Sequence, residues 1–167
     1  MTKKKEESVF FVKPLALHQA EKILRDLKYH FDEVQCSAPV TLPYSFWLNF
    51  HENEVLPYKE INANYLANKQ VVLGIVRGED AEERLFNLCG TTFRPKDCSR
   101  NSIRYRYRFE PEKIKINGVD FYINAIHRSL PGDAAREILL VRPYISRTLV
   151  RSANVNISNK QQNEREI

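Results

Sequence analysis

A histidine near the end of the chain stands among residues that suit nucleophilic chemistry. His127 closes an alternating apolar run, with Asn124 three residues before it and Ser129 two residues after it. A short helix that carries Glu137 is predicted to follow. A neutral imidazole is available near pH 7, and a carboxylate that accepts from one ring nitrogen leaves the other free to attack. The pattern predicts a nucleophile at His127; the alternative is a structural histidine at a strand end.

Two cations and a hydroxyl elsewhere in the chain have the chemistry that a bound phosphate needs. Lys13, at the exit of an apolar run, supplies a mobile point charge, and Arg104 supplies a forked donor. Thr92 offers a hydroxyl to a phosphate oxygen. Because phosphoryl transfer depends mainly on positioning and charge stabilisation, these residues suit a phosphate pocket. The alternative is a solvated cationic face, above all for Arg104, whose alternating run contains further arginines.

The charge balance favours anionic partners without choosing among them. The chain has 167 residues, with 26 Lys and Arg against 21 Asp and Glu and a formal net charge of +5. Nucleotides, nucleic acid and membrane surfaces all attract such a chain. Residues 104–109 interleave arginines with aromatic residues, as single-strand binders do, so nucleic-acid binding stays open as a secondary role. On a strand, however, the two sets would point to opposite faces.

Composition and cysteine usage predict a cytoplasmic globular protein. No apolar run approaches the roughly 18 residues that a membrane helix needs, so no membrane partner is expected. The Lys- and Glu-rich start lacks the apolar segment of a secretory signal. The three widely spaced cysteines suit reduced thiols, and no matching His or Cys pair predicts a protein-bound metal.

The pattern of apolar residues predicts one α+β domain over residues 9–145. Residues 1–8 are expected to be a flexible N-terminus and residues 146–167 a polar C-terminal tail. Strands are predicted at 9–13, 31–38, 71–76, 102–109 and 119–126, and helices at 18–29, 57–68, 79–88 and 133–141, with 44–50 as either. Their order predicts a ferredoxin-like sandwich, in which a four-stranded antiparallel sheet has helices on one face and is extended by a hairpin turning at Asn117-Gly118.

The segments that carry these residues resemble nucleoside diphosphate kinases. In that family Asn-x-x-His-Gly-Ser precedes a helix with a Glu, and residues 124–137 have a similar arrangement. Further matches are a first strand with a Lys-Pro step, a central strand that continues without a gap to a Gly-x-Thr, and an Ile-Arg step; they cover residues 9–14, 71–92 and 103–104. The resemblance spans most of the chain between Val9 and Ile138.

The resemblance implies a phosphotransferase. In the family the histidine takes the γ-phosphoryl group of a nucleoside triphosphate, with ATP as the expected donor here, and passes it to a diphosphate, which makes His127 the catalytic residue. The implied nucleotide contacts are Lys13, Thr92, Arg104 and Asn124. Ser129 and Glu137 would support the histidine, and Tyr58 or an aromatic ring among residues 44–50 would stack on the base, with core packing as the alternative. Mg²⁺ would bridge the phosphates, held mainly by substrate and water. Nucleoside di- and triphosphates are the expected partners, and a homo-oligomer is the expected assembly.

The chain departs from the family pattern at several of these positions. Phe86 stands where the family has an arginine that touches phosphate, and Arg84 and Arg94 are the nearby candidates to replace it. Arg128 replaces the small glycine after the histidine, so that it either adds phosphate affinity or obstructs the pocket. His51 falls where the family usually has a tyrosine. These departures leave a second hypothesis open, a catalytically weak nucleotide-binding regulatory module on the same fold.

Overall fold

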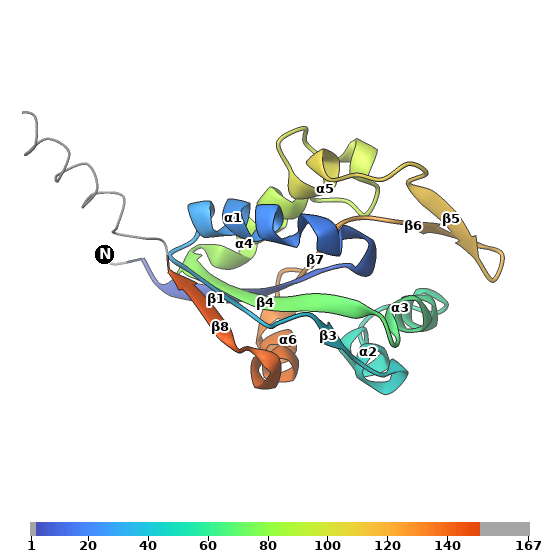
Figure 1. Cartoon of the computed structure of the whole chain (residues 1–167), viewed down its shortest axis with the longest axis horizontal. Coiled ribbons are helices and arrows are strands. Elements are labelled where there is room, and N and C mark those ends of the chain that lie inside the picture. The colour runs from blue at the N-terminus through green and yellow to red at the C-terminus, as the bar shows by residue number, and fades with distance from the viewer. Residues whose placement is uncertain (1–2, 151–167) are drawn as a thin grey trace, which may run out of the picture.

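The computed structural model describes residues 3–150, which fold around an antiparallel sheet (Figure 1). The strands lie in the order β7-β1-β4-β2-β8, and β3 pairs with β4 beside this path, always in antiparallel fashion. Their bounds are β1 (Lys5–Val12), β2 (Glu33–Cys36), β3 (Val40–Thr41), β4 (Gln70–Glu79), β7 (Ile126–Arg128) and β8 (Arg147–Val150). The predicted ferredoxin-like antiparallel sheet is confirmed, with β8 added at one edge.

Helices cover both faces of this sheet (Figure 1). One face carries α1 (Ala20–His30), α4 (Ala81–Cys89) and α5 (Ile103–Arg106); the other carries α2 (Tyr44–Phe50), α3 (Tyr58–Leu66) and α6 (Ala134–Val141). The prediction of helices on one face is wrong because the central strands are apolar on both sides. In β1, Phe10 and Val12 pack into one core cluster, whereas Val9 and Phe11 pack into the other.

A glycine in the central strand makes room for an aromatic ring of the neighbouring strand. Gly74 of β4 lies opposite Phe10 of β1, and a Cβ added to Gly74 would lie 2.1 Å from the Phe10 ring. Because the Phe10 ring is fully buried and would have to move to admit a Cβ, Gly74→Ala is expected to lower the free energy of unfolding by about 1–3 kcal/mol. Urea denaturation measures this loss. Gly78→Ala in the same strand is the matched control, since its nearest neighbours would lie 3.7 Å away; equal losses in both variants would contradict the steric explanation.

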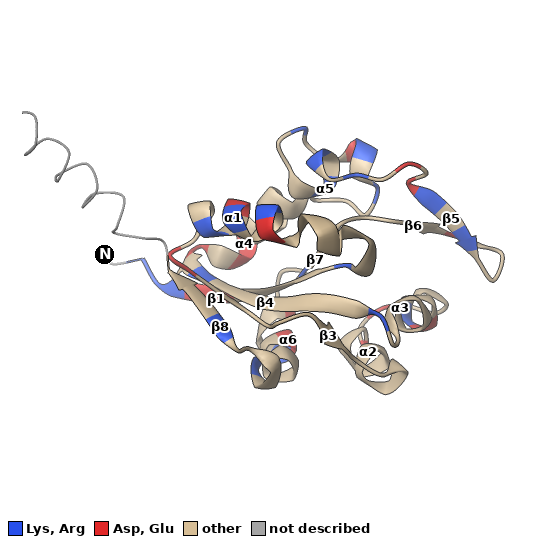
Figure 2. Ribbon diagram, viewed as in Figure 1, with Lys and Arg blue, Asp and Glu red and all other residues tan. Residues whose placement is uncertain are grey.

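A separate hairpin projects from the main sheet. It consists of β5 (Lys113–Ile116), whose lysines colour it blue in Figure 2, and β6 (Val119–Tyr122). The two strands pair with each other and not with the large sheet. Asn117 and Gly118 form the turn with φ values of 50° and 76°, the left-handed geometry that an Asn-Gly pair favours. The strand predicted at 119–126 is therefore two strands, because the chain leaves the hairpin before it joins β1 as β7.

The alternating segment 102–109 is not the predicted strand. Ser102 caps the single helical turn of α5 by accepting a hydrogen bond from the backbone N–H of Tyr105 at 3.3 Å. Ile103 and Arg104 are both buried, whereas Arg106 is exposed. The serine satisfies the backbone locally, so no partner strand is needed. The interleaved cations and aromatic rings consequently do not form the two opposite faces that a strand would give them.

Both ends of the ordered domain extend further than predicted. β1 begins at Lys5, which lies opposite Glu79, so half of the predicted flexible N-terminus belongs to the sheet. In the predicted polar tail, β8 pairs with β2, and its Leu149 packs against the core. The remainder of that tail, residues 151–167, lies outside the described residues. Within residues 3–150, no helix has the length and apolar character needed to cross a membrane.

Candidate functional site

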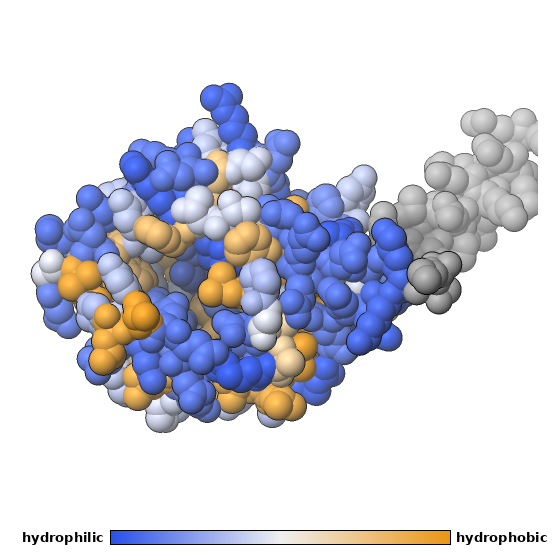
Figure 3. All heavy atoms as spheres, turned by 180° about the vertical axis from the view of Figure 1, so that it is seen from behind, coloured by the Kyte–Doolittle hydropathy of each residue, from blue (hydrophilic) through white to orange (hydrophobic). Residues whose placement is uncertain are grey.

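A cavity of about 710 Å³ opens where β7, α3, the loop after α4 and the β5–β6 hairpin approach one another. The face shown in Figure 3 is hollowed, with apolar residues bordering the hollow and hydrophilic residues inside it. A cavity of this size accommodates a small molecule. Eight residues proposed from the sequence line it: Lys13, Tyr58, Thr92, Arg104, Asn124, His127, Arg128 and Glu137. Ser129 and Arg94 are not part of its wall.

Aromatic packing and one carboxyl group fix the imidazole of His127. His127 lies opposite Phe11 in the sheet register, and the two rings stack with centroids 4.7 Å apart and planes inclined by 11°. Phe50 of α2 contacts the imidazole edge-on at 5.1 Å. Nε2 of His127 lies 2.7 Å from Oε1 of Glu137 on α6. Three elements thus hold the ring, and the 19% of the side chain that remains exposed faces the cavity.

Burial sets the charge state of this pair. Burial, followed by the charges of Lys13 and Arg104, lowers the pKa of His127 well below its usual value, so the imidazole is neutral at pH 7. Burial also raises the pKa of Glu137 to about 8. When Glu137 is ionised, Nε2–H of His127 donates to the carboxylate and the lone pair lies on Nδ1. An ionised Glu137 therefore selects the tautomer that can attack through Nδ1.

Ser129 connects the nucleophile's strand to its neighbour. Its Oγ accepts from the backbone N–H of Val9 at 3.3 Å and lies 3.4 Å from the Val9 carbonyl oxygen, to which it can donate. A hydrogen bond between Ser129 and Glu137 opposes the rise in the pKa of that carboxyl group. Ser129 therefore lies behind the His127–Glu137 pair, where it braces β7 against β1 without reaching the cavity.

Lys13, Arg104 and Arg128, three of the four cations that line the cavity, come from three different elements. Lys13 follows β1, and burial lowers its pKa to about 7, with the charge of Arg104 acting in the same direction. Arg104 of α5 is 4% exposed and donates to the carbonyls of Ile126 at 3.1 Å and Thr92 at 2.8 Å. Arg128 of β7 is 7% exposed. Within residues 3–150, none of the three cations has a carboxylate within ion-pair distance. These cations therefore lie in the cavity without a direct ion pair, although carboxyl groups, among them Glu54 and Glu137, line the same cavity.

Two polar groups face the cavity beside these cations. Asn124 donates through Nδ2 to the carbonyl of Phe93 at 3.2 Å, while its buried Oδ1 has no hydrogen-bond partner in the described part of the chain. Because buried polar atoms are normally paired, this oxygen is suited to a donor on a ligand, such as a hydroxyl. Oγ1 of Thr92 accepts from the backbone N–H of Arg94 at 3.2 Å and shapes the loop after α4. Tyr58, at the start of α3, is 45% exposed and stands at the cavity wall.

The arginines proposed to replace a missing phosphate contact are both engaged elsewhere. Arg84 donates to two backbone carbonyls, and its guanidinium lies over the Phe31 ring at 5.1 Å. Arg94 forms an ion pair with the largely buried Glu112 at 3.0 Å and anchors the start of the hairpin. Neither residue lines the cavity. The positions of these two arginines in the sequence did not predict their absence from the cavity, because each binds a residue that is distant in sequence: Arg84 binds the carbonyl of His30, and Arg94 binds Glu112.

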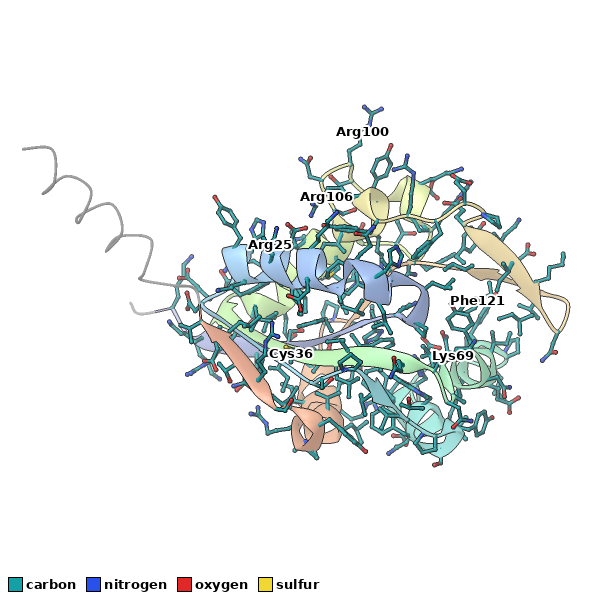
Figure 4. All side chains as sticks on the ribbon, viewed as in Figure 1. Arg25, Cys36, Lys69, Arg100, Arg106 and Phe121 are labelled. Carbon is teal, nitrogen blue, oxygen red and sulfur yellow. The ribbon has the colours of Figure 1, made fainter. Side chains whose placement is uncertain are left out.

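The sequence did not reveal the residues that close the far side of the cavity. Phe121 points from the hairpin toward α3 (Figure 4), with its ring centroid 5.1 Å from that of Tyr65. Phe121 and its neighbour Tyr122 line the cavity, as do Glu54 and Asn62 near α3. In the sequence, the Asn-Gly pair predicted the hairpin turn, but a turn does not indicate which part of the protein the hairpin packs against. Glu54 is a single acid in an irregular segment and belongs to no periodic pattern.

A second imidazole, that of His51, also borders the cavity. Nδ1–H of His51 donates to the carbonyl of Trp47 at 2.9 Å, which leaves Nε2 as an acceptor. Its ring centroid lies 6.2 Å from that of His127. Burial lowers the pKa of His51 to about 3, so this ring is neutral over the physiological range. His51 therefore offers the site an acceptor without adding charge.

The donor set suits a metal carried by a ligand better than a metal held by the protein. Among the described residues, no cluster of three or more His, Cys, Asp or Glu side chains could hold an ion. Glu54 is a carboxylate on the cavity wall that does not pair with the cations. Mg²⁺ is commonly bound through one or two carboxylates together with substrate phosphates and water. The carboxyl groups on the cavity wall, Glu54 among them, therefore fit Mg²⁺ that arrives with a phosphorylated ligand.

Comparisons with known proteins find the fold and no close sequence relative. No protein-family model matches the chain, and a search of curated proteins finds no match. A nucleoside diphosphate kinase structure from Aquifex aeolicus superimposes with a TM-score of 0.68 at 23% identity, covering 86% of this chain and all of the other. The Borrelia burgdorferi enzyme, described as a transition-state mimic with bound vanadate and ADP, gives 0.67 at 20% identity, over 86% of this chain and 91% of the other.

A third structure agrees with these two. The nucleoside diphosphate kinase of Halobacterium salinarum, solved in complex with CDP, has a TM-score of 0.66 at 20% identity and covers 86% of this chain and 93% of its own. The match extends over nearly the whole length of each of these proteins, so it includes the sheet and the helices on both of its faces. This chain therefore has the fold of the nucleoside diphosphate kinases.

Proposed function

We propose that this protein transfers the γ-phosphoryl group of a nucleoside triphosphate to a nucleoside diphosphate through a phosphohistidine at His127. The observation that carries the proposal is a neutral imidazole, oriented by Glu137, that faces a cavity with three cations lacking carboxylate partners. The solved nucleotide complexes of proteins with the same fold support a nucleotide as the ligand. The unpaired Oδ1 of Asn124 supports a hydroxyl-bearing ligand such as a ribose.

The residues of the cavity can perform the first half of the transfer. Lys13 and Arg104 attract and orient the phosphates, and Glu137 in its ionised form keeps the lone pair of His127 on Nδ1. Nδ1 attacks the γ-phosphorus, the bond from phosphorus to the β–γ bridging oxygen breaks, and its electron pair leaves with the nucleoside diphosphate. Mg²⁺, when bound with the nucleotide, supplies charge neutralisation across the phosphates.

The second half reverses these steps with another nucleotide. A terminal oxygen of the acceptor diphosphate attacks the phosphorus, the N–P bond breaks, and its electron pair returns to Nδ1 of His127. The hydrogen bond from Nε2–H to Glu137 stabilises the imidazole in both halves, because Nε2 keeps its proton throughout. The same residues therefore serve donor and acceptor.

Labelling with γ-³²P-ATP tests this proposal. The wild-type protein is expected to acquire acid-labile, base-stable label, and His127→Ala is expected to acquire none. His18→Ala, which removes an exposed histidine that does not line the cavity, should label like the wild type. Transfer of the label to added GDP completes the cycle. Persistent label in His127→Ala, or unlabelled wild type with demonstrated nucleotide binding, would overturn the transfer mechanism.

A nucleotide-binding module without transfer activity is the second candidate function. The raised pKa of Glu137 favours it, since a protonated carboxyl group donates to Nε2 and places the proton of the neutral ring on Nδ1. Such a protein would bind ADP in the same cavity, and His127→Ala would leave every activity unchanged. The nucleic-acid hypothesis loses its main argument, because Arg104 is buried in the cavity wall and does not lie on an exposed strand.

A further inference from the structure

Arg128 reaches the cavity from the opposite side of β7 to its neighbour His127. Successive residues of a strand point to opposite faces, and His127 accordingly packs on Phe11 while Arg128 lies opposite Phe10 and turns toward α4. Nevertheless both side chains line the same cavity, which lies at the edge of the sheet. The guanidinium of Arg128 therefore approaches the ligand space from the α4 side and the imidazole from the α6 side.

Phe86 and a backbone carbonyl hold this guanidinium in place. The guanidinium carbon of Arg128 lies 4.3 Å above the centroid of the Phe86 ring on α4. Nε of Arg128 donates to the carbonyl of Gly90 at 3.2 Å, just past the end of the same helix. An aromatic face supports one face of the planar cation, and the hydrogen bond at Nε fixes its rotation. Within residues 3–150, the terminal nitrogens of this guanidinium make no hydrogen bond and are available to a ligand.

The environment of Arg128 is costly unless an anion binds there. The side chain is 7% exposed, and neither Phe86 nor the Gly90 carbonyl carries a formal charge. Arg128 and the other two cations repel one another, since Arg128 lowers the pKa of both Lys13 and Arg104, and Glu137 offsets this only in part. A buried guanidinium normally pairs with a carboxylate, because desolvation without a partner is unfavourable. A forked cation held rigidly at a cavity wall is suited to the oxygens of a phosphate.

We infer that Arg128, supported by Phe86, binds the terminal phosphate of the nucleotide, so that the Phe86–Arg128 pair selects di- and triphosphates over monophosphates. This inference rests on the proposed nucleotide site. Arg128 follows His127 directly, and the phosphate that approaches His127 is the one farthest from the ribose. A nucleoside monophosphate lacks the outer phosphates that this contact requires. Phe86 acts as a positioning residue, because its ring supports the cation and does not itself contact the phosphate.

Binding of ADP and AMP to two single variants and their double variant tests the inference. Replacing Arg128 by glutamine is expected to weaken ADP binding about tenfold to 100-fold, the range for a lost charged hydrogen bond, with little change for AMP. Phe86→Leu keeps a bulky apolar residue but removes the aromatic face, and it is expected to weaken ADP binding about threefold to tenfold. In the double variant Phe86→Leu/Arg128→Gln, the Phe86 change should have no further effect, since both residues act through one cation.

Arg108→Gln is the matched control. The Arg108 guanidinium also lies 4.3 Å above an aromatic ring, that of Tyr105, but the residue is exposed and outside the cavity. It should bind ADP like the wild type. Circular dichroism checks that each variant folds. If Arg128→Gln does not fold, Arg128→Lys takes its place; it keeps the positive charge but loses the forked guanidinium, and its affinity for ADP is expected to lie below that of the wild type. Wild type that binds ADP and AMP equally, or additive effects of the two substitutions, would overturn the inference while leaving the nucleotide site intact. Absence of any nucleotide binding by wild type would overturn the proposed function itself.

Discussion

Glu137→Gln is expected to slow phosphorylation of His127 by about 100-fold to 10,000-fold above pH 8, where Glu137 is ionised, without weakening nucleotide binding. The carboxylate of Glu137 accepts from Nε2–H and so keeps the lone pair on Nδ1. Glutamine has nearly the same shape, but its amide can donate to Nε2, which stabilises the tautomer with the proton on Nδ1. Glutamine also lacks the negative charge that stabilises the more positive ring formed as Nδ1 attacks. The measurement is the single-turnover rate of labelling with γ-³²P-ATP, combined with the dissociation constant for ADP.

Ser129→Ala is the control for this substitution. It removes a side chain that braces β7 and hydrogen-bonds Glu137, but it keeps the carboxyl group beside Nε2, so its effect on the rate above pH 8 should be much smaller. An equal loss of rate in both variants would point to a general distortion of the site. A Glu137→Gln protein that labels as fast as wild type would show that the nucleophile does not depend on this carboxylate.

The sheet could be predicted because its central strands have strong local signals. Residues 9–12 and 71–76 are continuous apolar runs, and in the structure they form the buried parts of β1 and β4. The run at 102–109 has an equally clear alternation, yet it forms a helical turn, since Ser102 supplies a cap and no neighbouring strand is available. An alternating pattern shows which side chains would share a face if the segment were a strand. The segment forms a strand only where a neighbouring strand is available to pair with it.

The site could be predicted where its residues are close in sequence. Asn124, His127 and Glu137 lie within one strand-to-helix segment, so their proximity follows from the chain itself. The course of Arg128 could not be predicted, because its guanidinium is directed by Phe86, a residue on a different element. The position of Phe121 in the cavity wall could not be predicted for the same reason, since it depends on how the hairpin packs on α3. Contacts between segments that are distant in sequence depend on tertiary packing. The periodicity of a single sequence does not show which segments pack together.

The cluster of cations makes nucleotide affinity depend on pH through Lys13. Its pKa is lowered to about 7 by burial, by Arg104 and, to a smaller extent, by Arg128, whereas Glu54 opposes the shift. A bound phosphate stabilises the charged form and raises this pKa again. Above pH 7 the free protein has lost the Lys13 proton and the complex retains it, so binding takes up as much as one proton. By linkage, the affinity is greatest below pH 7 and falls as the pH rises.

ADP affinity is therefore expected to fall about tenfold per pH unit between roughly pH 7.5 and 9. Arg104, whose pKa is about 10, stays charged in this range, but Glu137 titrates near pH 8 and would add its own repulsion. The experiment is consequently done in the Glu137→Gln protein. Calorimetry in buffers of different ionisation enthalpy should detect the uptake of a proton there, and Lys13→Met in the same background should abolish both the uptake and the slope. Equal slopes with and without Lys13 would show that another group controls binding, and the three cations would then not act as one phosphate site.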